Sequence, residues 1–542
     1  MDQPVARARA RLTPAGAGLA VAAALPLGFL AVFFLWPVVA ILGLGLSSGS
    51  VLPVLTSSET WRLVAFTLGQ AAASTVLALL AGLPVAFLLA RIRLPGLALV
   101  RAAVLVPFVL PTVVVGLAFR VLLPAGGPVS IVLANAFFNV AVVARTVAGL
   151  WTHLDRRAED AARALGASRA RTFATVTLPA LTPAVSSAAA IVFLFCATSF
   201  GVVLVLGGAR YRTLETEIYL RTVQLLDLPG AAALSLLQLA AVLATLAVGA
   251  AARRRRETAL ALRGRAESAR RPAGAEWAVV ALALGVVGLL LVPVAVLALR
   301  SVSTSDGWSL AGYQALAGTG FPGTLEISGL DAAANSVRAA TDATVLAMTL
   351  GVTAAVVLVA LRRGRVRRAS VELMDSALML PLGVSAVTVG FGYLITLDKL
   401  PGDLRTSPAL IPLAQALVVT PLVVRIVLPV LRSIDERLRA AAATLGAGPA
   451  RVWREVDLPL AGRALLTAAA FGYVVALGEF GATSFLARPD TATLPVAIGR
   501  LISRPGELNN QMAYAACTLL MAVTVAVVLL VEWLRLPAVG EF

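Results

Sequence analysis

Long apolar runs alternate with short polar segments along the whole chain. About 20 apolar residues in an α-helix, at 1.5 Å per residue, are enough to cross the ~30 Å of bilayer hydrocarbon. The pattern therefore predicts an all-α, polytopic transmembrane helical bundle with about 12 spans. The expected spans lie near residues 18–46, 62–90, 97–123, 128–150, 180–207, 231–251, 276–299, 335–361, 371–397, 408–431, 460–486 and 512–534.

Composition supports a protein dissolved in a lipid bilayer. Of the 542 residues 59% are hydrophobic and 13% are charged, and the mean hydropathy is +0.91. A soluble globular protein has about 25% charged residues. The formal net charge of +17 would be compatible with nucleic-acid binding, but the arginines cluster between the apolar runs, as in the cytoplasmic loops of membrane proteins. We therefore expect no nucleic-acid partner, and a membrane protein with both termini cytoplasmic.

The chain contains an internal repeat. Residues 135–219 align without gaps with residues 415–499 at an offset of 280, and 26 of these 85 positions are identical. Each half has six predicted spans, so the two repeats are parallel, and a pathway is expected between them. The predicted organisation is a first transmembrane half 1–251, a basic cytoplasmic linker 252–272 and a second transmembrane half 273–542.

One polar segment in each half is long and patterned, at 156–180 and 436–460. Each predicts a short amphipathic helix with a stripe of small residues, then a glycine in a left-handed cap, then a proline in the first turn of the next helix. Such a helix suits a groove on a partner protein; the alternative is a helix lying flat on lipid. The stripes are Ala158, Ala161, Ala162 and Leu165, and Leu438, Ala441, Ala442 and Leu445; the glycines are Gly166 and Gly446, and the prolines Pro179 and Pro459.

These segments resemble the EAA motif of ABC importer permeases. In the first copy Asp160 precedes Ala161 and Ala162, with Gly166 and Pro179 at the later motif positions. The resemblance implies type I ABC importer transmembrane domains, in which each segment is a coupling helix seated in a cytoplasmic ABC ATPase dimer. The second copy departs from the motif, because Ala440 stands at the acidic position. The two docking sites are therefore expected to be unequal.

The fused arrangement resembles the thiamine and ferric-iron permeases. Residues 198–219, together with Asp227, Ala231 to Ala233 and Gln238, are most similar to the thiamine type, so thiamine is the favoured cargo and ferric iron the next. The resemblance implies a location in the bacterial cytoplasmic (inner) membrane and delivery of the cargo by an extracytoplasmic substrate-binding protein.

A carboxylate inside an apolar run is a further candidate. Glu479 lies within an expected span, where an unpaired charge costs at least a few kcal/mol, and a carboxylate facing the pathway would suit a cationic cargo. The alternatives are a pair with Arg425 or bonds to backbone amides near Gly481. The candidate pathway residues, at matching positions of the two halves, are Ser199, Phe200, Glu479 and Phe480.

The chain itself has no phosphate-binding loop of the type G-x-x-x-x-G-K-[ST]. We therefore expect no cofactor bound by this chain, with ATP used by a separate subunit. No nucleophile–base set or metal-ligand cluster is evident in the sequence, which argues against an enzyme and against a metal site. A 12-span secondary transporter is the rival interpretation, and the paired docking segments are the feature that distinguishes the two.

Overall fold

The computed structural model describes residues 14–254, 270–304, 307–318, 325–363, 368–396 and 407–534. The first half contains α1 Pro14–Leu30, η1 Ala31–Leu35, α2 Trp36–Ser47, α3 Val51–Thr56, α4 Ser58–Arg91, α5 Leu97–Val109, α6 Thr112–Leu122, α7 Gly127–His153, α8 Arg157–Ala164, α9 Arg169–Thr172, η2 Phe173–Thr177, α10 Leu178–Ala197, α11 Gly201–Leu206, α12 Leu214–Tyr219, η3 Leu220–Gln224 and α13 Leu228–Arg254.

The second half repeats much of this order. Its only strands among the described residues form a two-residue antiparallel pair, β1 Ser303–Thr304 with β2 Gly307–Trp308. Its helices are α14 Glu276–Arg300, α15 Ala311–Leu316, α16 Gly329–Arg363, α17 Arg368–Met379, η5 Leu380–Gly383, α18 Ala386–Thr396, α19 Leu410–Ser433, α20 Glu436–Thr444, α21 Pro449–Val452, η8 Trp453–Asp457, α22 Leu458–Leu477, α23 Thr483–Leu486, α24 Leu494–Ser503 and α25 Glu507–Leu534.

The predicted all-α bundle of about 12 spans is confirmed. Ten of the described helices are long and apolar enough to cross a membrane, and two bent helix pairs bring the total to as many as 12. The bent pairs are the expected spans 97–123 and 371–397, which turn by 98° and 94°. In the first pair, Leu110 has an extended backbone and precedes Pro111. The proline ring disfavours a helical conformation of the residue before it. Each of these two expected spans is therefore a pair of shorter helices joined by a sharp bend.

Two other expected spans, 180–207 and 460–486, end early. α10 stops at Ala197 and a separate short helix, α11, follows from Gly201; α22 likewise stops at Leu477, before the short helix α23. The backbone leaves the helix near residues 198–200 and 478–480, and these breaks contain all four candidate pathway residues. Hydropathy alone does not detect them, because the residues on both sides are apolar.

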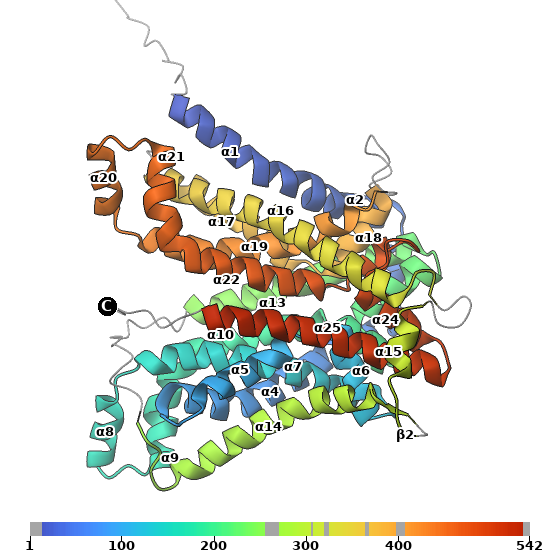
Figure 1. Cartoon of the computed structure of the whole chain (residues 1–542), viewed down its shortest axis with the longest axis horizontal. Coiled ribbons are helices and arrows are strands. Elements are labelled where there is room, and N and C mark those ends of the chain that lie inside the picture. The colour runs from blue at the N-terminus through green and yellow to red at the C-terminus, as the bar shows by residue number, and fades with distance from the viewer. Residues whose placement is uncertain are drawn as a thin grey trace, which may run out of the picture.

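The first helix of each half packs on the other half. α1 lies along α16, and α2 contacts α18, whereas α14 contacts α4, α5 and α6 (Figure 1). The two halves therefore exchange their first spans, which ties them into one bundle. The largest hydrophobic cluster contains residues of both halves, from Phe29 to Leu520.

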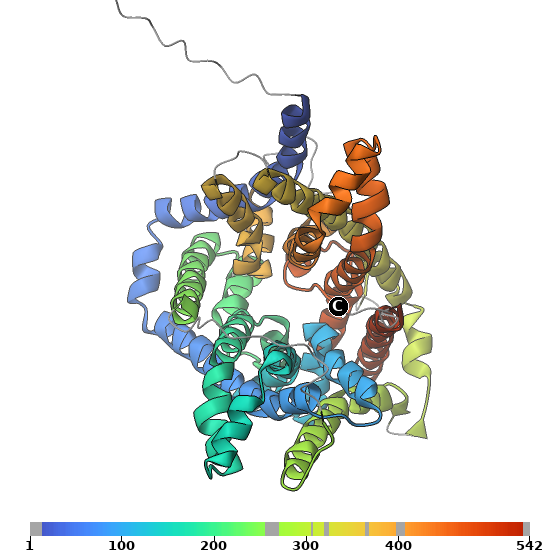
Figure 2. The ribbon, with the colours of Figure 1, turned by 90° about the vertical axis from the view of Figure 1, so that its left-hand side faces the viewer.

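The segments α8–α9 and α20–α21 project from the same end of the bundle (Figure 1). Seen from that end, they lie on opposite sides of the molecule (Figure 2). This placement is what two parallel repeats related by a central axis require. Most of the expected linker, residues 255–269, lies outside the described residues, but Arg270 is described and exchanges backbone hydrogen bonds with Arg91 and Arg93 at 3.0 and 2.8 Å.

Candidate functional site

The segments α8–α9 and α20–α21 have the same backbone. Gly166 and Gly446 have φ of +85° and +83°, the left-handed region that glycine adopts at no steric cost. The amide of Ala167 donates to the carbonyl of Ala162 at 3.0 Å, and that of Ala447 to Ala442 at 3.0 Å. These are Schellman caps, so the helix end expected at each glycine is confirmed.

The outer face of each short helix is uncovered. Neither α8 nor α20 contains a buried residue. Leu165 and Leu445, the last residues of the two stripes, are 89% and 87% exposed, as are Ala161 and Ala441 to a large extent. An apolar side chain left this exposed at the same place in both repeats favours a protein contact at that tip.

The prolines occupy the expected first turn, but the helix does not begin there. Residues Arg169–Ala197 and Pro449–Leu477 each form one continuous span, with a π-helical turn immediately before Leu178 and Leu458. Pro179 and Pro459 have no amide hydrogen to donate into the preceding turn, and a wider π turn accommodates the ring. The segment after each glycine is thus a direct extension of α10 or α22.

A buried ion pair fastens α8 to the bundle. Glu159 accepts a hydrogen bond at 3.0 Å from Nη2 of Arg91, on α4, and another at 3.0 Å from Oγ1 of Thr177, in η2. The side chains of Arg91 and Glu159 are 4% and 13% exposed. α8 is therefore tied both to a neighbouring span and to the start of its own.

The second half carries the opposite charge on its short helix. Arg439, which the repeat pairs with Glu159, donates to Asp457, the equivalent of Thr177, at 2.6 Å. Arg439 also donates to the carbonyls of Ile434 and Leu431, each at 3.1 Å. Sequence reasoning missed both anchors, although the opposite charges at positions 439 and 457 were a usable signal.

At the other end of α10 and α22, the two repeats meet through aromatic rings. Phe200 and Phe480, equivalent residues, stack with ring centroids 5.4 Å apart and planes 20° from parallel. Tyr219 packs edge-on against Phe200 and against Phe485, each at 5.2 Å. Two of the four candidate pathway residues thus meet between the halves, on the axis that relates them.

The other two candidates are engaged in local bonds. Ser199 donates to Oδ1 of Asn135 at 2.8 Å. Both carboxylate oxygens of Glu479 accept hydrogen bonds from backbone amides, of Ala482 at 2.8 Å and Thr483 at 3.0 Å. Arg425 is exposed. The interpretation of Glu479 as an acceptor for nearby amides therefore has direct geometric support, and contact with a cargo stays a prediction.

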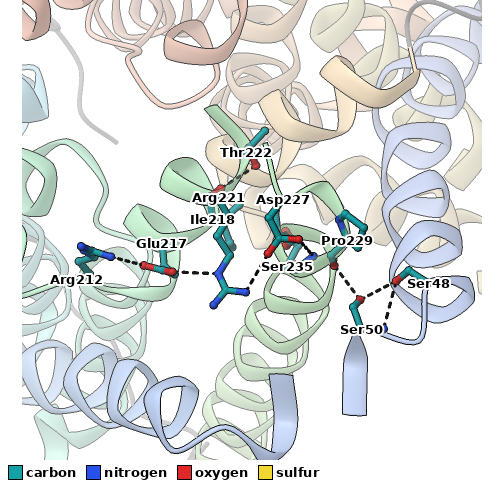
Figure 3. A network of polar contacts seen from close by, with 12 residues as sticks. Ser48, Ser50, Arg212, Glu217, Ile218, Arg221, Thr222, Asp227, Pro229 and Ser235 are labelled. Atoms are coloured by element: carbon teal, nitrogen blue, oxygen red, sulfur yellow. Dashed lines mark hydrogen bonds and ion pairs between the residues drawn. The ribbon is translucent and has the colours of Figure 1, made fainter. Parts of the chain in front are cut away.

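A polar network stabilises the chain between α11 and α13, at the end opposite α8. Glu217, 3% exposed, accepts hydrogen bonds from Arg212 at 3.1 Å and from Arg221 at 3.0 Å. Arg221 continues to Asp227 at 3.2 Å, and Asp227 accepts from the amide of Gly230 (Figure 3). Three of the residues that carry the thiamine-type resemblance, Arg212, Glu217 and Asp227, therefore belong to one network.

A second carboxylate in this region joins the two halves. Glu215 is fully buried and accepts hydrogen bonds from Gln238 at 3.0 Å and from Ser385 at 2.5 Å. Ser385 lies at the bend of the second half's broken span. Glu215 is outside the candidate membrane spans, and burial raises its pKa to about 8.

Comparison with known proteins defines the class. Residues 78–257 and 347–535 each match the family model of the binding-protein-dependent transport system inner membrane component. The chain therefore belongs to this family, and it is a multi-pass permease of the ABC importer type, not an enzyme.

Individual relatives agree with this assignment. The chain is 25% identical over 496 residues to the thiamine transport system permease protein ThiP of Brucella abortus, covering 87% of each protein. It is 33% identical over 176 residues to the molybdenum transport system permease protein ModB of Escherichia coli, covering 30% of this chain and 76% of that one. It is 32% identical over 209 residues to the sulfate transport system permease protein CysT of Escherichia coli, covering 35% and 75%.

Proposed function

We propose that the protein is the fused permease of a thiamine importer. The likeness to thiamine permeases extends over both halves and 87% of the chain, whereas the likeness to the molybdenum and sulfate permeases covers about a third of it. The internal scaffold around Glu217 and Asp227, which carries the thiamine-type resemblance, supports the same choice. Ferric iron remains the alternative cargo.

In this proposal α8 and α20 dock on the two subunits of a cytoplasmic ABC ATPase, so both termini are cytoplasmic. An extracytoplasmic binding protein then docks at the opposite end. The exposed Leu165 and Leu445 are the tips that enter the ATPase clefts.

The stacked pair of Phe200 and Phe480 is the observation that carries the mechanism. α10 and α22 are 20 residues long, about 30 Å at 1.5 Å per residue, and each runs without a break from its cytoplasmic segment toward one of these rings. Closure of the ATPase dimer would move α8 and α20, and the two helices would transmit this motion and separate the rings. The aromatic pair acts as the gate.

The test uses the chain reconstituted in proteoliposomes with its ATPase and binding protein. Thiamine-loaded binding protein is expected to stimulate ATP hydrolysis and thiamine uptake, and Fe³⁺-loaded binding protein of the iron type is not. F200A should raise hydrolysis in the absence of cargo, because the closed pair is lost. F137A, which removes a buried ring of the Phe119–Phe137 pair, is the control. The proposal would be contradicted if thiamine-loaded binding protein did not change the rate of ATP hydrolysis. It would also be contradicted if F200A and F137A raised cargo-free hydrolysis equally.

A further inference from the structure

A pocket of about 490 Å³ lies beside α8, between α4, α9 and α14. Its polar side contains five arginines and two glutamates, a formal surplus of three positive charges. These residues are Arg91, Arg156, Arg163, Arg169, Arg270, Glu159 and Glu276.

Several N–H groups of this pocket are buried without a hydrogen-bond acceptor among the described residues. Arg91 is 3% exposed, and only its Nη2 is bound, to Glu159. Its Nε and Nη1 make no hydrogen bond to any described residue, and the same holds for Nε of Arg163 and Nε1 of Trp151, which also line the pocket. Buried donors of a charged group are costly to leave unsatisfied, so the arrangement calls for hydrogen-bond acceptors within the pocket, and the surplus of positive charge favours an anionic ligand.

The other side of the pocket is apolar and opens outward. Leu80 on α4 and Leu282 on α14 line it and are 66% and 57% exposed. Both helices are candidate membrane spans, so these surfaces face the acyl region of the bilayer. Leu80 lies eleven residues before Arg91, roughly 16 Å along the helix, a distance that a lipid chain would follow from a headgroup at Arg91.

We propose that this pocket binds an anionic glycerophospholipid. The phosphate lies against Arg91, Arg163 and Arg169, and one acyl chain runs along Leu80 and Leu282. Basic pockets between spans on the cytoplasmic side are suited to such headgroups. A free phosphate ion would satisfy the arginines but leave the apolar wall uncovered, so the lipid is the ligand that matches both sides.

The second copy of the repeat lacks the arginines of this site. At the positions that the repeat pairs with Arg163 and Arg169, the second half has Ala443 and Pro449. One anionic lipid per chain is therefore expected, beside α8 and not beside α20.

The test measures lipid retention by native mass spectrometry of the full chain. The chain is exchanged into detergent with equal amounts of phosphatidylglycerol and phosphatidylcholine. Wild type should retain one phosphatidylglycerol in preference to phosphatidylcholine, and R163Q/R169Q should weaken that preference about tenfold or more, since each basic residue contributes about 1 kcal/mol. The control R157Q/R171Q removes the same charge from the same two helices at residues outside the pocket, and should leave the preference unchanged.

A second measurement locates the acyl chain. Brominated phosphatidylglycerol should quench part of the tryptophan fluorescence of wild type, and this part should disappear in W151F. Equal retention of the two lipids by wild type, equal losses in both double variants, or displacement of the lipid by millimolar inorganic phosphate would overturn the proposal. The readouts need neither ATPase nor cargo, so they are independent of the transport assay.

Discussion

The segments α8–α9 and α20–α21 share a backbone and differ in the charges that hold it. In the first, a carboxylate on the helix, Glu159, binds an arginine of a different span. In the second, an arginine on the helix, Arg439, binds Asp457 at the base of its own span and two carbonyls close by. The glycine caps and π turns are nevertheless the same in both.

This difference shows that two short helices with the same backbone can be fastened to the bundle by different arrangements of charge. The cap and the following span determine where each helix lies, and the buried pair only needs to be neutral as a unit. The first anchor includes α4, so in the proposed mechanism movement of α8 is expected to act on a second span directly. The second anchor is local to its own repeat, and α20 is expected to act mainly through α22.

The largest effect is expected from breaking the first anchor. E159Q leaves Arg91, 4% exposed, without its counter-charge, and loss of one partner of a buried pair costs about 3–5 kcal/mol. The chain should show a markedly lower unfolding temperature in detergent. E436Q is the control, because Glu436 is 72% exposed where it meets Arg363, and such pairs contribute about 1 kcal/mol or less. Equal unfolding temperatures of E159Q and E436Q would show that the Arg91–Glu159 pair does not stabilise the fold more than the exposed pair does.

A charge transplant would sharpen the comparison. Gly82 and Gly351 make the same close approach to α7 and α19, so Ala360 on α16 is the equivalent of Arg91 on α4. The second half therefore has no arginine at the position from which Arg91 binds Glu159.

The double variant E159R/T177D gives the first half the pair of the second, but places two arginines together. We expect it to be unstable, and the triple variant R91A/E159R/T177D to recover at least half of the lost stability. Thermal unfolding of the two variants side by side provides the measurement. A triple variant no more stable than the double would mean that the two anchors are not interchangeable.

An intermediate effect is expected at the caps. Nothing lies within 4 Å of a Cβ added to Gly166 or Gly446, so substitution acts only through the left-handed backbone, at a cost of roughly 1–2 kcal/mol. G166V and G446V should insert normally but hydrolyse ATP with little uptake, because the helix end is displaced in its cleft. G149A, at a helical glycine with similar open space, is the control. Unchanged uptake in both valine variants would count heavily against docking.

A smaller effect separates two roles of Glu479. Glutamine cannot accept hydrogen bonds from two amides with both terminal atoms, so E479Q should lower the amount of folded protein, and uptake should fall in proportion. The equivalent residue, Ser199, provides the comparison through S199A, which loses one bond to Asn135. Uptake per folded molecule is the deciding quantity: a loss in this ratio for E479Q would instead favour cargo contact.

Sequence patterns predicted the features that depend on neighbouring residues. The spans, the glycine caps and the docking stripes follow from local periodicity, and the repeat identified them twice. The bends at Leu110 and Val384, the exchange of α1 and α14 between halves and the anchor at Arg91 depend on contacts across the fold. Glu159 and Arg91 are 68 residues apart, and no local pattern connects them. The pairing of Phe200 with Phe480 was implied by symmetry, but only the fold shows that the rings touch.

The last expected effect depends on pH and is smallest in acid, at the junction where Glu215 joins the two halves. Its pKa of about 8 in the folded protein is above the ordinary value of 4.5, because burial disfavours the charged form. The folded state therefore binds the extra proton, and the stability that Glu215 contributes is complete below about pH 4.5 and is lost as pH rises through about 8.

E215Q, which resembles the protonated acid, should match wild type in unfolding temperature near pH 5. It should then decline less than wild type up to pH 8.5, with Q238A as the control that removes a hydrogen-bond donor without removing the titrating group. Parallel pH profiles for wild type and E215Q would show that the carboxyl group at this junction titrates normally.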